Sequence, residues 1–303
     1  MDDLAVLRHF NRIYTQRVGV LEDSFLGMGR PLSVSRLLYE IGAVDSIAVA
    51  VLREMLGMDS GQLARTLRRL EREGLVTTTP DPADRRRRIV RLTGAGREVW
   101  QEMEARSDLK ASQLLTPLTP HQRSRLHDAL ETADLLVRAA TVEFREVPVD
   151  DPRARTAQHA YFAELHERMG YQDPGPEPVT PGAVHLVACS DGQPVAHGEL
   201  RPEPTIPDAG ELKRLWVHRD WRGAGLGSRT LRRLETLARD SGYARLYLDT
   251  NSALAEAVSL YDHLGYRRVD RYNDNPDAEL FFCKDLIGSR DSGPGADTTA
   301  ALT

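Results

Sequence analysis

The chain has 303 residues, a formal net charge of -5 at pH 7 and 41% hydrophobic residues. That length allows two domains of ordinary size, and the composition is that of a soluble globular protein. The apolar runs are too short to span a bilayer, and the N-terminal Met-Asp-Asp-Leu lacks the basic and apolar regions of a secretory signal. We therefore expect a cytoplasmic protein without membrane contact, in which Cys189 and Cys283 are reduced. No Cys/His cluster has metal-ligand spacing, so no metal is expected.

The first 140 residues have the apolar periodicity of helices, with one short interruption. Apolar side chains recur at helical spacing between Leu4 and Tyr14. The further predicted elements are helices at 33–41, 46–56 and 60–73, a hairpin with strands at 75–79 and 88–92, and long helices at 94–114 and 120–140. The last helix begins at Thr119-Pro120, an N-cap followed by proline at the first helical position.

After residue 140 the pattern changes to alternating strands and helices. Asp191-Gly192 separates two apolar runs and is a strong signal for a two-residue hairpin turn. The predicted elements are strands at 144–147, 184–189, 194–200, 211–218, 244–249 and 280–284, and helices at 154–169, 225–241 and 253–264. This alternation predicts an α/β domain with a mixed sheet. Residues 288–303 are small and polar without periodicity, which predicts a disordered tail.

The helix predicted at 60–73 has the features of a DNA-recognition helix. Leu63, Leu67 and Leu70 fall at i, i+4 and i+7 and form one apolar face, while arginines occupy the remaining surface. A short Gly-containing turn joins it to the preceding helix, which predicts a helix-turn-helix. Four consecutive arginines, 85–88, lie at the bend of the following hairpin and suit the minor groove and nearby phosphates. Each feature alone is also typical of a solvated surface, but their combination and order favour DNA binding.

The hairpin region resembles the wing of the MarR family of winged-helix regulators. The stretches that carry the resemblance are Gly74-Leu75-Val76, Asp81 to Arg86, Val90 to Thr93 and Gly96-Arg97. The resemblance implies a homodimer, built from the N-terminal helix and the two long helices, that binds a palindromic operator in double-stranded DNA. By position, Gln62, Arg65 and Arg69 would approach bases, and Arg86 would enter the minor groove with Asp84 bracing it. The implied DNA-binding set is Gln62, Arg65, Arg69, Asp84, Arg85 and Arg86.

A glycine-rich turn in the second half is typical of phosphate binding. Residues 222–227 read Arg-Gly-Ala-Gly-Leu-Gly, shortly after a strand-like segment and directly before a helical one. Glycines let backbone N–H groups approach an anion, and a helix N-terminus adds partial positive charge. A Rossmann dinucleotide site is the main alternative, but it requires the glycines early in a βαβ unit, whereas this turn follows several strands.

The same turn is similar to the Gln/Arg-x-x-Gly-x-Gly/Ala signature of the GNAT acetyltransferases. Residues 247–251 and 257–266 also resemble that family, and the resemblance covers residues 142 to 287. It implies acetyl-CoA as co-substrate, with the amides of residues 223 to 227 around its diphosphate and the strand before the turn along its pantetheine arm. The implied cofactor-binding residues are Leu215, Trp216, Val217, Arg222, Gly223, Ala224, Gly225, Leu226, Gly227 and Asn251.

The resemblance also implies how the acetyl group is transferred. An amine attacks the thioester carbonyl, a backbone N–H near Val217 holds the oxyanion, and Tyr261, at the family's acid position, protonates the leaving thiolate. Glu211, expected as an exposed carboxylate at a strand end, is the candidate general base. Its competitors are Glu199, His197 and His218. Pro-rich loops without aromatic residues, at 172–181 and 202–209, favour a small amine as acceptor, with a protein lysine as the other possibility.

The sequence thus predicts a multidomain chain. An α-rich winged helix-turn-helix with a small β-wing is expected at 1–140, an α/β GNAT domain with a mixed sheet at 142–287 and a tail at 288–303. The leading hypothesis is a transcriptional regulator that is also an N-acetyltransferase. The alternatives are an acetyltransferase whose winged helix only dimerises it, and a regulator whose GNAT domain only senses acetyl-CoA or another ligand.

Overall fold

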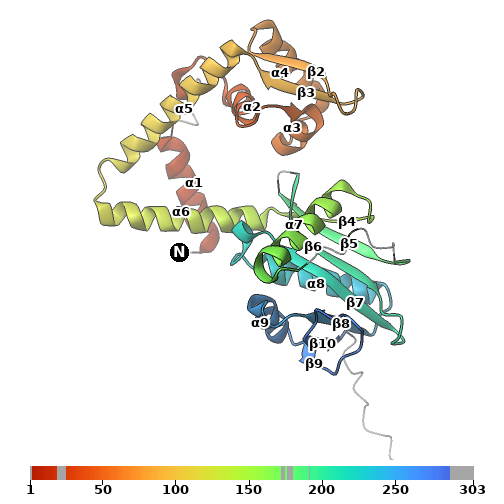
Figure 1. Cartoon of the computed structure of the whole chain (residues 1–303). Helices are drawn as coiled ribbons and strands as arrows, with labels where there is room; N and C mark the ends of the chain where they lie inside the picture. The colour runs from red at the N-terminus through yellow and green to blue at the C-terminus, as the bar shows by residue number, and fades with distance from the viewer. Residues whose placement is uncertain (1, 19–24, 172–174, 176–179, 191, 287–303) are drawn as a thin grey trace, which may run out of the picture. The chain divides into compact units, whose positions relative to one another are not determined.

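A computed structural model describes residues 2–18, 25–171, 175, 180–190 and 192–286. The chain divides into two compact units at Glu131/Thr132, and Figure 1 shows their elements in chain order. The tail predicted at 288–303 lies outside the described residues, as does most of the predicted loop at 172–181. Within the described part of the chain, no helix is both long and apolar enough to cross a membrane.

The first unit is a winged helix-turn-helix with long flanking helices. Its elements are α1 (Asp3–Arg17), η1 (Phe25–Gly27), α2 (Leu32–Gly42), β1 (Ile47–Ala48), α3 (Val49–Leu56), α4 (Ser60–Arg72), β2 (Val76–Pro80), β3 (Arg88–Leu92), α5 (Gly94–Leu115) and α6 (Pro120–Ala140), which continues into the second unit. The three strands form an antiparallel sheet in the order β1-β3-β2. The predicted helix at 46–56 was wrong at its start, because Ile47 pairs with Val90 of β3 as a short strand before α3 begins.

Leucines of α4 anchor the recognition helix to the core of this unit. Leu63, Leu67 and Leu70 are all buried, as their spacing predicted. The helix begins where the Asp59 side chain accepts a hydrogen bond from the backbone N–H of Gln62 at 2.9 Å. These contacts leave the opposite, arginine-bearing face of α4 exposed.

The base of the wing is held by a close backbone approach. Gly96, in the first turn of α5, lies so near β2 that an added Cβ would be 1.9 Å from the Leu75 carbonyl oxygen. Thr93 caps α5 by accepting from the Gly96 N–H at 3.0 Å, and its hydroxyl donates to the Gly74 carbonyl at 2.6 Å. The hairpin is thereby fixed at its base, while its tip projects from the unit (Figure 1).

The second unit is an α/β domain with a mixed sheet of seven strands. After the end of α6 its elements are β4 (Glu143–Val147), α7 (Pro152–Met169), β5 (Val184–Ser190), β6 (Gln193–Pro202), β7 (Ala209–Val217), η2 (Arg219–Trp221), α8 (Leu226–Asp240), β8 (Arg245–Thr250), α9 (Ala255–His263), β9 (Arg267–Arg268) and β10 (Leu280–Asp285). The strand order is β4-β5-β6-β7-β8-β10-β9, and among the described strands only β7 and β8 pair in parallel. Helices cover both faces: Leu186 of β5 packs in the cluster that holds α8, whereas Val187 packs with Ala154 of α7.

The sheet opens where the parallel pairing of β7 with β8 ends. Strands β7 and β8 pair from Ala209 to Leu212. Just beyond, the register of β6 against β7 shifts and Arg214 adopts a positive φ of 55°, as in a β-bulge. The last residues of β7, Leu215 to Val217, therefore stay beside β6 and have no pairing with β8. This opening positions the site described next.

Candidate functional site

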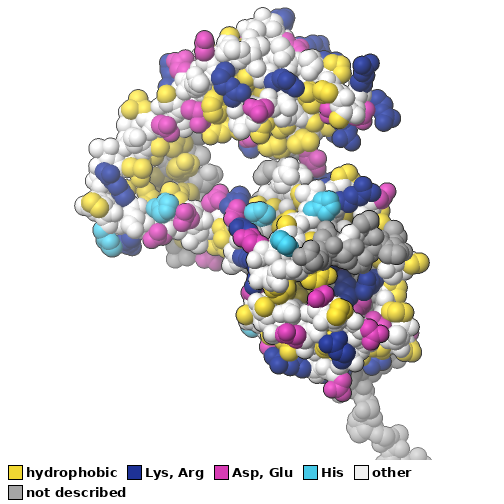
Figure 2. Space-filling model, viewed as in Figure 1, with side chains coloured by type: hydrophobic (Ala, Val, Ile, Leu, Met, Phe, Trp, Pro, Cys, Tyr) yellow, Lys and Arg dark blue, Asp and Glu magenta, His cyan; other side chains and the backbone are white. Residues whose placement is uncertain are grey.

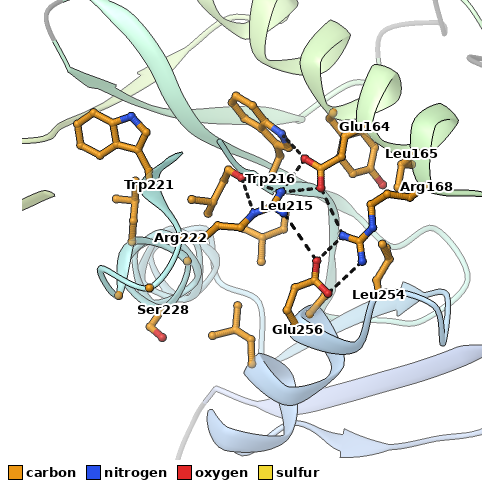
Figure 3. A pocket seen from close by; sticks show the side chains of 18 residues that line it. Glu164, Leu165, Arg168, Leu215, Trp216, Trp221, Arg222, Ser228, Leu254 and Glu256 are labelled. Carbon is orange, nitrogen blue, oxygen red and sulfur yellow. Dashed lines mark hydrogen bonds and ion pairs between the residues drawn. The ribbon is translucent and has the colours of Figure 1, made fainter. Parts of the chain in front are cut away.

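A cleft of about 330 Å³ lies at this opening of the sheet (Figure 3). Side chains and backbone from α7, the end of β7, the glycine turn, α8 and α9 line it. Its walls are Tyr161, Glu164, Leu165, Arg168, Leu215, Trp216, Val217, Trp221, Arg222, Gly223, Gly225, Leu226, Gly227, Ser228, Leu254, Glu256, Ala257 and Leu260. Eight of the ten residues expected at the cofactor are in this set, and Ala224 and Asn251 are not.

The glycine turn has the backbone conformation that anion binding requires. Gly223 and Gly225 have φ values of 82° and 74°, and a Cβ at either would meet nothing within 4 Å. Gly225 is the N-cap of α8, and no side chain caps the helix there. The first N–H groups of α8 therefore have no intrahelical partner, and Gly225, Leu226 and Gly227 at this helix start line the cleft.

Asn251, which the family resemblance implied at the cofactor, is not among the residues that line the cleft. Its amide nitrogen donates to the Asp277 carbonyl at 3.0 Å, and its side-chain oxygen accepts from the Ala253 N–H at 2.9 Å. Both bonds hold the turn between β8 and α9. The side chain thus shapes the neighbourhood of the cleft without lining it.

Two arginines and two glutamates form an ion-pair cluster across the cleft, which Figure 3 shows with dashed lines. Arg222 binds Glu164 at 2.6 Å and lies 3.9 Å from Glu256. Arg168 binds Glu164 at 3.3 Å and also pairs with Glu256. Trp216 donates its indole N–H to Glu164 at 3.3 Å. The cluster joins α7 and α9 to the glycine turn.

The sequence prediction missed Glu164, Arg168 and Glu256. A signal was present in α7, because Tyr161, Glu164 and Arg168 fall at i, i+3 and i+7 and so share one helix face. Burial alone would raise the pKa of Glu164, but the hydrogen bond and charge of Arg222, with help from Arg168, hold this pKa below its ordinary value. The carboxylate therefore stays ionised well into acid.

Arg222 also contacts the end of β7. Its Nε and Nη2 atoms each donate to the Val217 carbonyl oxygen at 3.1 Å. This carbonyl is one of the backbone groups expected to pair with the pantetheine arm. A ligand at that carbonyl must therefore compete with the Arg222 guanidinium.

Tyr261 is a buried phenol beneath the α9 wall of the cleft. It is the buried residue of α9, and its ring packs on Tyr266 and Phe282 at centroid distances of 5.8 and 5.7 Å. Ala257 and Leu260 of the same helix line the cleft, whereas Tyr261 does not. Burial, with smaller contributions from neighbouring groups, raises the pKa of Tyr261 above its usual range. The phenol is therefore protonated at every physiological pH, as a proton donor must be.

Glu211 is not the exposed carboxylate that was expected. It is 2% exposed within β7 and accepts from four donors: Arg201 at 2.8 Å, Lys213 at 3.0 Å, and Tyr272 and Asn273 at 3.0 Å each. Both carboxylate oxygens are thereby engaged by partners inside the protein. Tyr272 and Asn273 supply the last two donors from about 60 residues further along the chain.

The other candidate bases also lie outside the cleft lining. Glu199 is buried and paired with Arg214 at 3.2 Å. His197 is fully buried, 3.0 Å from His185, and burial together with that neighbour lowers its pKa to about 3. His218 accepts from the Asp220 N–H at 3.3 Å and lies edge-on to Trp216. Among the described residues, no group of three His, Cys, Asp or Glu side chains is arranged to hold a metal ion.

The residues expected to bind DNA are brought together on α4 and the wing of the first unit. Gln62 and Arg65 are exposed on α4. Arg69 is also exposed, but its Nε binds Glu73 at 2.8 Å. Arg30 binds the same carboxylate at 2.5 Å, and that hydrogen bond is the main reason why the pKa of Glu73 is lowered. The end of the recognition helix is therefore tied to the segment before α2.

The wing presents its arginines to solvent. The Arg86 side chain is 92% exposed, and Asp84 lies 3.3 Å from its Nε while also accepting from its backbone N–H at 3.0 Å. Arg85 is exposed beside it. Figure 2 shows Lys and Arg side chains gathered over the tip of the β2–β3 hairpin. Asp84 thus contacts Arg86 as the resemblance implied.

Comparison with known proteins assigns each half of the chain to a class. Residues 142–266 match the acetyltransferase (GNAT) family, and residues 26–87 match the MarR family. The chain therefore contains a MarR-type winged helix-turn-helix domain followed by a GNAT acetyltransferase domain.

Individual relatives match one half or the other. An uncharacterised N-acetyltransferase of Escherichia coli, YjgM, is 33% identical over 91 residues, which are 30% of this chain and 54% of that protein. An uncharacterised HTH-type transcriptional regulator of Bacillus subtilis, YdgJ, is 29% identical over 114 residues, 37% of this chain and 68% of that protein. The chain thus spans about half the length of YjgM. A solved GNAT acetyltransferase from Staphylococcus aureus superimposes with a TM-score of 0.43 at 14% identity, over 48% of this chain and all of that one.

Proposed function

We propose that the protein is a DNA-binding transcriptional regulator that also transfers acetyl groups from acetyl-CoA to a small amine. The observation that carries the enzymatic half is the glycine turn, which leads into the uncapped N-terminus of α8 at the opening between β7 and β8. The cleft there has the size of a small-molecule site, and most of its lining is apolar apart from the ion-pair cluster.

The geometry supports the following division of roles. Backbone N–H groups of residues 223 to 227 hold the diphosphate, with Arg222 adding positive charge. Apolar residues of β7 and α9 enclose the pantetheine arm and exclude water from the thioester. The amine nitrogen attacks the thioester carbonyl carbon, and a backbone N–H near Val217 stabilises the oxyanion. The carbon–sulfur bond then breaks, and Tyr261, the acid that the family resemblance implies, donates its proton to the thiolate. The proton that the attacking amine loses passes to water, and the phenol regains a proton from water.

Titration calorimetry of the full chain with acetyl-CoA tests the enzymatic half. One site per chain in the micromolar range supports a working cofactor site. No heat of binding at millimolar acetyl-CoA would refute it. A screen of small primary amines, read out by release of free coenzyme A thiol, then tests turnover.

The DNA-binding half is supported by the exposed arginines and by an uncovered apolar helix. No residue of α1 is buried within the single chain, and Leu4, Leu7 and Phe10 are each about half exposed. A second copy of the chain would cover such a surface, in keeping with a dimer that reads two half-sites.

Variants of the wing and of α4 test DNA binding directly. Selection of duplexes from a random pool, followed by fluorescence anisotropy, should yield a palindromic site. Arg86→Ala and Arg69→Ala should weaken binding, and Arg86→Ala should reduce the slope of log affinity against log salt by about 1. Arg155→Ala, the same charge change on α7, is the control. If no sequence is selected, the winged helix serves only to dimerise an acetyltransferase.

One observation favours a ligand sensor as a second candidate function. Glu211, Glu199, His197 and His218 all lie outside the cleft lining, so the cleft lacks the expected base. A sensor would bind acetyl-CoA but not turn it over with any amine. Turnover by the full chain that falls in Tyr261→Phe would exclude the sensor.

A further inference from the structure

The last turn of α6 belongs to the second unit and lies against the glycine turn of the cleft. Residues 132–140 of this helix group with the GNAT domain, although α6 begins in the first unit. Ala139, in the last turn, is 2% exposed, and Val142 just beyond is 7% exposed. The matched GNAT region starts at residue 142, so the end of α6 lies just outside the match.

Arg138 holds the residue that precedes the glycine turn. Its guanidinium lies 4.7 Å from the centroid of the Trp221 ring, a cation–π distance. Asp134, one turn earlier in α6, binds Arg138 at 2.7 Å and fixes the guanidinium over the ring. Trp221 is 6% exposed, ends η2, lines the cleft and is followed directly by Arg222.

A second contact lies on the other side of the turn. Arg229, in the first turn of α8, donates to the Ala139 carbonyl oxygen at the end of α6. Its guanidinium also lies 5.3 Å from the centroid of the Phe144 ring in β4. Carbonyl groups in the last turn of a helix have no intrahelical partner and favour cations, so this bond satisfies a group that needs one.

We infer that Arg138 is a positioning residue for acetyl-CoA binding, acting through Trp221. The end of α6 contacts residue 221 on one side of the glycine turn and residue 229 on the other. Arg138 itself does not line the cleft. It restricts the conformations of Trp221 and so of the turn that presents backbone N–H groups to the diphosphate. This inference rests on the proposed acetyl-CoA site, and it means that a fragment starting at residue 142 has an incomplete site.

The test compares variants of the full chain by calorimetry and by steady-state kinetics. Arg138→Ala should raise the Kd and KM for acetyl-CoA about three- to tenfold, the size expected for one partly desolvated cation–π contact. The kcat should stay within about twofold, because Arg138 is not near the reacting atoms. Arg138→Lys, which keeps the charge but not the planar guanidinium, should restore part of the affinity. Arg125→Ala, an exposed arginine on the same helix, is the matched control and should behave as the wild type.

A double-mutant cycle with Trp221→Leu separates positioning from a general effect on folding. If Arg138 acts through the indole, adding Arg138→Ala to Trp221→Leu should change the Kd little further. Additive effects, or an Arg138→Ala variant that binds as tightly as Arg125→Ala, would overturn the inference while the acetyl-CoA site stands. A wild-type protein that fails to bind acetyl-CoA would overturn the proposed site, and the inference would fall with it.

Discussion

Gly225 offers the sharpest test of the cofactor site, because replacing it changes the anion-binding turn without a clash inside the protein. Gly225 has φ 74° and ψ 7°, the left-handed conformation, and an added Cβ would meet nothing within 4 Å. Alanine can therefore be accommodated at this position, with strain in the backbone alone.

The size of the effect on stability follows from that conformation. A non-glycine residue in the left-handed region costs about 1 kcal/mol relative to glycine. For a domain of this size, that loss lowers the melting temperature by about 2–4 °C. The new methyl group would also stand in the open space beside the α8 N-terminus, where the diphosphate is proposed to lie. Displacing an anion from two or three N–H groups should weaken acetyl-CoA binding by roughly tenfold or more.

Gly242 provides a matched control. It has φ 86°, and a Cβ there would also meet nothing within 4 Å, but it follows α8 at the opposite end from the cleft. Gly242→Ala should lower the melting temperature as much as Gly225→Ala and leave the Kd for acetyl-CoA unchanged by calorimetry. Equal affinities for the two variants would refute the assignment of the diphosphate to this turn.

Three further predictions concern the acid, the ion-pair cluster and the wing. Tyr261→Phe should lower kcat by about 100-fold or more with little change in the Kd for acetyl-CoA. Tyr266→Phe, which changes the neighbouring ring, should leave kcat unchanged. Equal kcat values for the two variants would remove Tyr261 from the mechanism. Glu164→Gln should lower the melting temperature at pH 7, because a carboxylate with a lowered folded pKa contributes stability above its unfolded pKa of about 4.3. That contribution is lost as pH falls through the folded value, so the difference between the two melting temperatures should shrink as the pH is lowered below about 4, and a difference that stays constant with falling pH would contradict this account. Gly96→Ala should destabilise the first unit by about 3 kcal/mol or more, because its Cβ would lie 1.9 Å from the Leu75 carbonyl oxygen; a cooperative melting transition like that of the wild type would disprove the close approach.

Local periodicity was enough to predict most elements of the fold. The α4 leucines at i, i+4 and i+7 are buried as expected, and the wing strand at 88–92 has the bounds that the sequence indicated. The start of α3 could not be predicted this way, because Ile47 becomes a strand residue only by pairing with Val90. That pairing is a tertiary contact over 43 positions and leaves no local signal.

The sequence predicted the part of the site that one continuous segment forms. It did not predict the parts that several distant segments form together. The glycine turn is continuous in sequence, so its residues were found together. The ion-pair cluster draws Glu164, Arg222 and Glu256 from three elements. Likewise, the burial of Glu211 depends on Tyr272 and Asn273, which close over it from a distant segment. No local pattern distinguishes such a carboxylate from an exposed one at a strand end.

The short connection between α6 and β4 gives the contacts of α6 their significance. Strand β4 begins at Glu143, so only Thr141 and Val142 separate it from the end of α6, and Val142 is itself buried. Because only these two residues connect α6 to β4, the connection cannot absorb a displacement of the helix. If the glycine turn changes conformation when it binds a diphosphate, Trp221 and Arg229 must carry that change to the end of α6 or lose their contacts with it. Binding free energies coupled through such contacts are reciprocal, so a ligand that favours one conformation of the glycine turn would favour the matching position of the α6 end by the same factor.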